Sequence, residues 1–271
     1  MTIESKLAPP VVVVLVVDTP GERFDQVLDG VINQNYENYQ VLVMNRGHSS
    51  NADRVLATIV DATVQQLPNA KTYAEAANVV SDLVEGAAFY LFLRDDTALA
   101  PNAVSLLVEE ALESNAAVLG PKVVDFNDPS RILYMGFVAD AFAVSTPIVE
   151  PGELDQEQHD RVREVFSVSG HAVLVRSDLF VTIGGFDQRI SDFEEYLDLC
   201  WRVQIAGGRI LVVPTATVHS LDLISAQDQP RSRRLSMRYR QHIVAKCYGW
   251  VHLVPTLIMA MLLSLLELTY S

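Results

Sequence analysis

Apolar runs and amphipathic segments alternate along the first half of the chain. Three continuous aliphatic or aromatic runs have the pattern of strands buried on both faces of a parallel sheet: 11–17, 39–44 and 88–93. Apolar residues at helical spacing predict helices at 24–34, 52–60, 73–84 and 101–112. This alternation predicts an α/β domain with a Rossmann-like, mostly parallel central sheet that is flanked by helices.

The second half of the chain has a less regular pattern. Short apolar segments predict strands at 123–124, 131–138, 172–175 and 210–213. Helices are expected at 178–183 and 194–206, and a glycine pair follows each of them as a helix stop. The segment 146–164 contains prolines and many acids, which is typical of a long surface loop, and such loops often serve as lids or binding loops.

Composition and charge narrow the class of protein. The 271 residues suit one large domain or two small ones, and 49% of them are hydrophobic, as in globular proteins. Thirty-four acids against twenty lysines and arginines give a net charge of −14, which argues against nucleic acid as a partner. Two cysteines are too few for a disulfide scaffold or a cysteine-rich zinc site. The first ten residues do not have the pattern of a secretory signal, so we expect a cytosolic location.

The C-terminal end departs from this average. Six of the twenty basic side chains fall within sixteen residues: Arg231, Arg233, Arg234, Arg238, Arg240 and Lys246. A mostly apolar run follows at 251–266. This end is either a core helix or a membrane-surface or transmembrane helix whose basic collar binds anionic headgroups. We favour the second interpretation, with a domain at 1–225 and a membrane-associated helical segment at 226–271. Membrane contact through 231–271 would then hold the domain on the cytoplasmic side.

Two acids directly follow the third buried strand. Asp95 and Asp96 stand where a parallel sheet binds its ligands, beyond the carboxyl ends of its strands. Mg²⁺ or Mn²⁺ is commonly held there by one or two carboxylates together with phosphate oxygens. The alternative is that one aspartate only caps the helix that begins near Pro101.

A second group of acids opens the helix at 194–206. Glu194, Glu195 and Asp198 lie three or four residues apart, so they share a face of this helix, and one of them is a candidate general base. Alternatively, they only stabilise the helix N-terminus through its dipole. The chain has no glycine-rich phosphate loop, so phosphate recognition falls to a metal and scattered side chains.

The order of several short motifs is more specific than any one of them. In chain order they are 34–39 (QNYENY), 41–44 (VLVM), 76–78 (AAN), 92–96 (FLRDD), 101–103 (PNA), 120–122 (GPK), 184–187 (GGFD), 198–202 (DLCWR), 206–208 (AGG) and 213–219 (VPTATVH). Over residues 10–220 this order resembles the family 2 glycosyltransferases, which are inverting enzymes with the GT-A fold. The resemblance is greatest to bacterial membrane-linked members that build cell-surface polysaccharides.

The resemblance implies a nucleotide-diphosphate-sugar donor and a divalent metal, Mn²⁺ or Mg²⁺, with a glycan or lipid-linked acceptor. It assigns roles to eleven residues: donor binding to Thr19, Asn45, Asn78 and Asp95, metal binding to Asp96 and His219, the acceptor side to Gly184, Gly185 and Asp187, and catalysis to Glu195 and Asp198. It further implies a single displacement at the anomeric carbon, in which a carboxylate takes the proton of the acceptor.

Four residues depart from the pattern of that family. Arg94 stands where an acid is common, Asn45 replaces an aspartate, Thr72 replaces a glycine, and Tyr196 aligns with the catalytic aspartate. A one-residue shift would bring Glu195 to the position of the base, with Asp198 as the second candidate. The alternative functions are a catalytically degenerate domain that binds nucleotide sugars or serves as a scaffold, and a nucleotidyltransferase.

Overall fold

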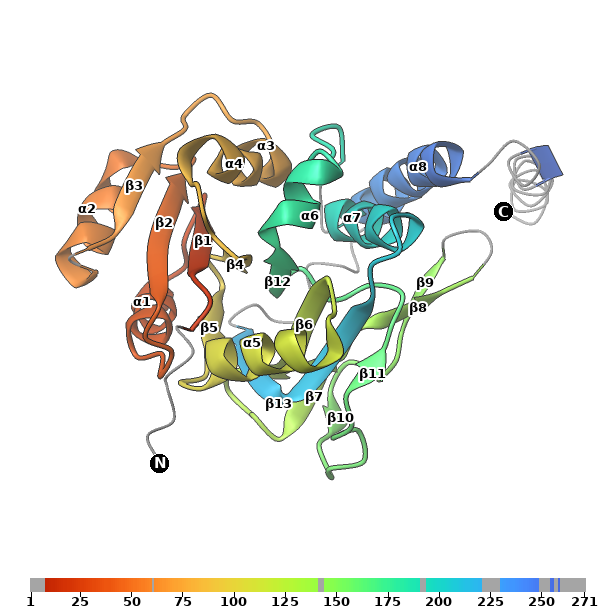
Figure 1. Cartoon of the computed structure of the whole chain (residues 1–271), viewed down its shortest axis with the longest axis horizontal. Helices are drawn as coiled ribbons and strands as arrows, with labels where there is room; N and C mark the ends of the chain where they lie inside the picture. Colours follow the sequence, from red (N-terminus) through yellow and green to blue (C-terminus); the bar gives the residue numbers. More distant parts are fainter. Residues whose placement is uncertain are drawn as a thin grey trace, which may run out of the picture.

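The computed structural model of the chain describes residues 8–59, 61–140, 144–190, 194–220, 230–248, 254–255 and 258. It has a central β-sheet with helices on both faces, so the predicted α/β class is confirmed (Figure 1). A separate two-stranded ribbon, made of β8 (Phe137–Ala139) and β9 (Ser145–Pro147), stands beside the main sheet.

Four parallel strands form one half of the sheet, in the order β4-β1-β2-β3. Their bounds are Val11–Val17 for β1, Tyr39–Asn45 for β2, Thr63–Gln66 for β3 and Phe89–Arg94 for β4. Every residue of β1 is buried, because helices cover both faces of this strand. This burial on both faces explains the unbroken aliphatic run of β1, as the sequence predicted.

Helices connect these strands and supply the two halves of the core. Their bounds are Phe24–Ile32 for α1, Ser49–Thr58 for α2, Tyr73–Asn78 for α3, Val80–Leu83 for α4 and Ala103–Ser114 for α5. Alternate residues of β1 divide between the faces: Val13 packs with α1 and α5, and Val14 packs with α3. The predicted single helix at 73–84 is wrong in detail, since it is two short helices that meet at Val79.

The other half of the sheet is mixed. Strand β12 (Ala172–Arg176) is antiparallel to both β4 and β6 (Val118–Asp125), and β6 is parallel to β13 (Ile210–Ser220). Shorter strands complete it: β5 (Thr97–Leu99), β7 (Arg131–Tyr134), β10 (Glu153–Leu154) and β11 (Arg163–Glu164). Helices α6 (Ser177–Thr182) and α7 (Glu194–Ile205) cover the same face as α3.

Two sequence predictions need correction in this half. The strand predicted at 210–213 does not end at Pro214 but continues to Ser220, with a shift of register after Val213. An irregularity of this kind accommodates a proline that has no N–H to donate. The expected loop at 146–164 contains β10 and β11, and the ammonium of Lys122 lies 2.5 Å from the carboxylate of Asp155 within it.

Helix α8 (Pro230–Cys247) packs beside α7 (Figure 1). Ile243 is buried against Ile190 and Leu197, and Trp201 makes an edge-on ring contact with Tyr248. Among the helices that the structure describes, none combines the length and the apolar character needed to cross a bilayer. Most of the apolar run predicted at 251–266 lies outside the described residues, so its membrane role stays a prediction.

Candidate functional site

The carboxyl ends of β1, β2 and β4 lie at one edge of the sheet, because these strands are parallel and adjacent. The backbone N–H of Asp18, just after β1, donates to Oδ2 of Asp95, just after β4, over 2.9 Å. Burial raises the pKa of Asp95, although the Asp18 N–H opposes this shift. This hydrogen bond joins the segments that follow β1 and β4, at the place where the sequence predicted a ligand site.

Arg94 and Asp96 form an ion pair at the end of β4. Nε of Arg94 lies 3.6 Å from Oδ2 of Asp96, and the hydroxyl of Thr97 donates to the other carboxylate oxygen over 3.0 Å. The Arg94 guanidinium lies 5.7 Å from the ring centroid of Tyr73 on α3. Burial would lower the pKa of Arg94, but the charges of Asp96 and Glu195 raise it above its usual value. Glu195 of α7 therefore belongs to the electrostatic environment of the Arg94–Asp96 pair.

Tyr196 occupies the position at which the resemblance expects an aspartate base. Its hydroxyl donates to the hydroxyl of Tyr73 over 2.6 Å, inside a cluster of aromatic rings that includes Phe186. Burial raises the pKa of both tyrosines far above the neutral range. A phenol of this kind keeps its proton at pH 7, so Tyr196 packs α7 against α3 and does not replace the missing aspartate as a base.

Glu195 and Asp198 are both fully buried, with an exposed fraction of 0%, but their partners differ. The charge of Glu195 raises the pKa of Arg94. The carboxylate of Asp198 lies 2.6 Å from Arg202, one turn further along α7, and 2.9 Å from Nζ of Lys246 on α8. The structure therefore places Glu195 in the electrostatic environment of the β4 end and pairs Asp198 with Arg202 and Lys246.

Asn78, which the sequence predicted to bind the sugar donor, holds the turn after α6. The side-chain amide of Asn78 donates to the carbonyl of Phe186, and its oxygen accepts the Phe186 N–H, each over 2.8 Å. A Cβ at Gly185 would lie 2.5 Å from that amide oxygen, and Gly184 and Gly185 both have positive φ. Asn78 and the glycine pair thus form one unit that joins the predicted donor side to the predicted acceptor side. Asp187, next in the turn, lies 2.9 Å from Lys246.

The remaining predicted site residues are dispersed around the sheet edge. Asn45 is buried at the end of β2, where its amide donates to the His48 carbonyl and accepts the Gly47 N–H, so it shapes the turn. Thr19 is exposed in the loop after β1. His219 lies on β13 beside β5, with its ring 6.3 Å from that of Phe126, and burial lowers its pKa.

The described side chains do not by themselves form a complete set of ligands for a metal ion. Within the ranges that the structure describes, no three histidine, cysteine, aspartate or glutamate side chains are grouped closely enough to bind one ion. Asp95 accepts the Asp18 N–H, and Asp96 has the positive charge of Arg94 beside it. Asp96 and His219 therefore do not belong to a group of three protein ligands, and a divalent metal held by them together with phosphate oxygens stays a prediction.

Two further residues near the β4 end could not be identified as site candidates from the sequence. Tyr73 lies beneath the Arg94 guanidinium, and the carbonyl of His171 accepts the Arg94 N–H over 3.2 Å. Burial lowers the pKa of His171 to about 4, and its ring contacts the Ser169 hydroxyl over 2.6 Å. An isolated tyrosine or histidine resembles any core residue in a sequence, because its neighbours come from distant strands.

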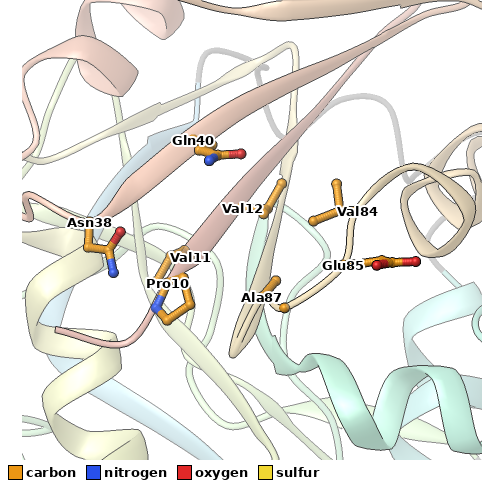
Figure 2. Close-up of a pocket in the computed structure, with 9 residues that line it drawn as sticks. Pro10, Val11, Val12, Asn38, Gln40, Val84, Glu85 and Ala87 are labelled. Carbon is orange, nitrogen blue, oxygen red and sulfur yellow. The ribbon is translucent and has the colours of Figure 1, made fainter. Parts of the chain in front are cut away.

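A small pocket lies at the opposite end of the sheet (Figure 2). Its lining residues include Pro10 and Val12 at the start of β1, Gln40 near the start of β2, and Glu85 in the loop before β4. These positions are at the amino ends of the parallel strands, whereas Asp95 and Asp96 follow the carboxyl end of β4. The pocket therefore contains none of the predicted site residues.

A family model described as Glycosyltransferase like family 2 matches residues 9–243. The chain belongs to this family. The match begins just before β1 and extends into α8 of this family 2 glycosyltransferase, so it includes every predicted site residue. Membership of the family classes the chain as a transferase, and no curated protein sequence matches it.

Solved structures show that this glycosyltransferase has the GT-A fold. It is similar to a structure of GalNAc-T7 with UDP, GalNAc and Mn²⁺, with a TM-score of 0.69 and 13% identity over 87% of this chain and 48% of that chain. It is also similar to TarS of S. aureus, with a TM-score of 0.62 and 14% identity over 92% of this chain and 42% of that chain. The chain spans about half or less of each of these chains.

Proposed function

We propose that the chain transfers a sugar, with inversion, from a nucleotide-diphosphate sugar to a glycan or lipid-linked acceptor. The observation that carries this proposal is the Arg94–Asp96 ion pair at the carboxyl end of β4 in a member of a glycosyltransferase family, where the charge of Glu195 also raises the pKa of Arg94. Sugar-nucleotide chemistry needs a place for a diphosphate and a carboxylate base near it. The UDP in the GalNAc-T7 structure supports a nucleotide donor.

The proposed reaction is one displacement at the anomeric carbon. The acceptor hydroxyl attacks from the face opposite the diphosphate, its proton passes to Glu195, and the bond to the diphosphate breaks. Attack from the opposite face inverts the anomeric configuration. Asp198 is the weaker candidate for the base, because its carboxylate already forms ion pairs with Arg202 and Lys246.

In this proposal the donor lies across the ends of β1, β2 and β4. Thr19 is the exposed residue that meets the nucleotide, and Asn45 and Asn78 shape the turns on either side of it. Gly184, Gly185 and Asp187 border the acceptor. Asp95 closes the β1 and β4 ends beneath the diphosphate. The described side chains contain no group of three ligands for one ion, and each step of this mechanism is assigned to a side chain of the protein.

The enzymatic test uses single-turnover and steady-state transfer with UDP-, GDP- and dTDP-sugars. We expect Glu195→Gln to lower kcat by at least about 100-fold while nucleotide binding is retained, since general acid–base catalysis typically contributes this much or more. Glu194 is the adjacent acid, and its carboxylate lies 3.1 Å from Arg240. The matched control is Glu194→Gln, which we expect to keep most of the activity. Nucleotide binding without turnover under any condition would instead favour a degenerate, donor-binding module.

The location on the membrane is part of the same proposal. Basic residues in 231–271 would bind anionic lipid and keep the acceptor side close to the cytoplasmic face of a cell membrane, as in the synthesis of cell-surface polysaccharides. Vesicles with and without phosphatidylserine provide the test. We expect binding to require the anionic lipid, to weaken with salt, and to weaken further in the Arg231→Gln, Arg233→Gln, Arg234→Gln triple variant. Equal binding to neutral vesicles would contradict the electrostatic part of this proposal.

A further inference from the structure

Arg94 places a fixed positive charge where a diphosphate would lie. The residue is the last of β4, opposite Val16 of β1, so its position is set by the centre of the sheet. The backbone of Arg94 is part of the buried strand β4, whereas its side chain is 24% exposed. The fold therefore holds the Arg94 side chain in place at the strand end and leaves part of that side chain exposed.

The surroundings of Arg94 limit the directions in which the guanidinium can point. Its Nε lies 3.6 Å from Asp96, its Cζ lies 5.7 Å from the ring centroid of Tyr73, and its pKa is raised by the charges of Asp96 and Glu195. Arg94 is thus electrostatically coupled both to the acid at the strand end and to the proposed base. A planar guanidinium can bind phosphate oxygens through two parallel N–H donors, which a rotating ammonium cannot do.

The charge count at the strand end also changes with this residue. Residues 94–96 carry one positive and two negative formal charges, a sum of −1, whereas an acid at 94 would make this sum −3. A less negative strand end attracts a divalent cation more weakly and repels a diphosphate less. The described side chains also contain no group of three ligands for one ion.

We propose that Arg94 binds the donor diphosphate and neutralises its charge in place of a divalent metal, with Asp96 as a positioning residue for Arg94. This inference rests on the proposed function. As the acceptor oxygen bonds to the anomeric carbon, the carbon–oxygen bond to the diphosphate breaks and its electron pair goes to the phosphate oxygen. The acceptor proton goes to Glu195, and Arg94 stays protonated beside the new negative charge. Positive groups aimed at a developing charge commonly make a large contribution to catalysis.

The first measurement needs no variant. Calorimetric titrations of the full chain with UDP, GDP and dTDP, and with the corresponding monophosphates, are made in EDTA and in Mn²⁺. We expect one diphosphate to bind with an affinity that EDTA changes by less than about twofold, and sugar transfer to continue in EDTA. Loss of diphosphate binding or of turnover in EDTA, restored by Mn²⁺, would overturn the proposal.

Variants then assign the effect to the side chain. Arg94→Gln should weaken diphosphate binding by about tenfold to a hundredfold, the range expected for charge-assisted hydrogen bonds, and leave monophosphate binding nearly unchanged. Arg94→Lys keeps the charge and should fall between Arg94→Gln and the unaltered protein. Asp96→Asn should lower kcat and retain diphosphate binding in EDTA. If Arg94→Gln leaves the ratio of diphosphate to monophosphate affinity unchanged, the Arg94 inference fails although the proposed function survives. If the folded protein binds none of these nucleotides under either condition, the proposed function itself fails.

Discussion

The hydroxyl of Tyr196 donates a 2.6 Å hydrogen bond to the hydroxyl of Tyr73, and this bond joins α7 to α3 through the interior. Both rings are buried with Phe186, so the pair has a packing role at the position where the resemblance expects a base. The proposed catalytic carboxylate is the preceding residue, Glu195. The packing role of Tyr196 and the proposed catalytic role of Glu195 predict different effects of substitution at the two positions.

Replacing Tyr196 by phenylalanine removes the hydroxyl and leaves the ring. We expect Tyr196→Phe to reduce the free energy of unfolding by about 1 kcal/mol, because one buried hydrogen bond is lost. Its kcat should stay within a few-fold of the unaltered protein. Urea unfolding and steady-state transfer measure the two effects. A loss of kcat as large as that of Glu195→Gln, with unchanged stability, would show instead that the phenol takes part in the reaction.

Lys246 connects α8 to two acids of the domain, Asp187 and Asp198, each over 2.9 Å. Lys246→Met should lower the free energy of unfolding by roughly 1–3 kcal/mol, since it leaves two buried carboxylates with one fewer cation. The effect is smaller than for a fully buried pair because Lys246 is 30% exposed. The matched control is Arg54→Met, which breaks an exposed ion pair with Asp25 and should leave the urea midpoint nearly unchanged.

The same cluster predicts the direction of a pH effect. The pKa of Asp187 is lowered well below its usual value near 3.8: burial would raise it, but hydrogen bonds from Arg189 and Lys246 outweigh burial. A lowered native pKa adds stability that is fully present above about pH 5 and is lost as the pH falls through and below the ordinary aspartate range. The free energy of unfolding should therefore fall between about pH 5 and pH 2, and Lys246→Met should show a shallower fall. Equal slopes in the two proteins would exclude this contribution.

Gly184 and Gly185 provide a matched pair for the turn that Asn78 holds. Both have positive φ, +82° and +67°, but a Cβ at Gly184 meets open space, whereas one at Gly185 meets the Asn78 amide at 2.5 Å. Gly184→Ala should lower stability by about 1 kcal/mol, the strain of a left-handed residue. Gly185→Ala should lower it by more than about 2 kcal/mol and also impair transfer, because it displaces the link between α3 and the turn. Melting temperatures and kcat/KM test the difference, and equal effects would contradict it.

The regular elements of the parallel half were predictable because their causes are local. The residues of β1 form one unbroken apolar run, and α1 repeats its apolar positions at the helical period, so both were placed within a few residues. Strands β3 and β5 were missed, since they are short and lack an alternating pattern. The end of β13 was also missed, because Pro214 is a strong breaker in a sequence and the pairing of β13 with β6 overrides it.

The candidate site likewise has features that the sequence predicts and features that depend on the tertiary structure. The position of Asp95 and Asp96 at a strand end follows from the sequence, because a buried run must end where charged residues begin. The partners of the charged side chains could not be predicted, since ion pairs join segments far apart in the chain. Their spacing predicted that Glu195 and Asp198 share one helix face. In the structure, the charge of Glu195 raises the pKa of Arg94 on β4, whereas Asp198 forms an ion pair with Lys246 of α8. Local periodicity decides which residues are buried, and only the packing of distant elements decides which charges meet.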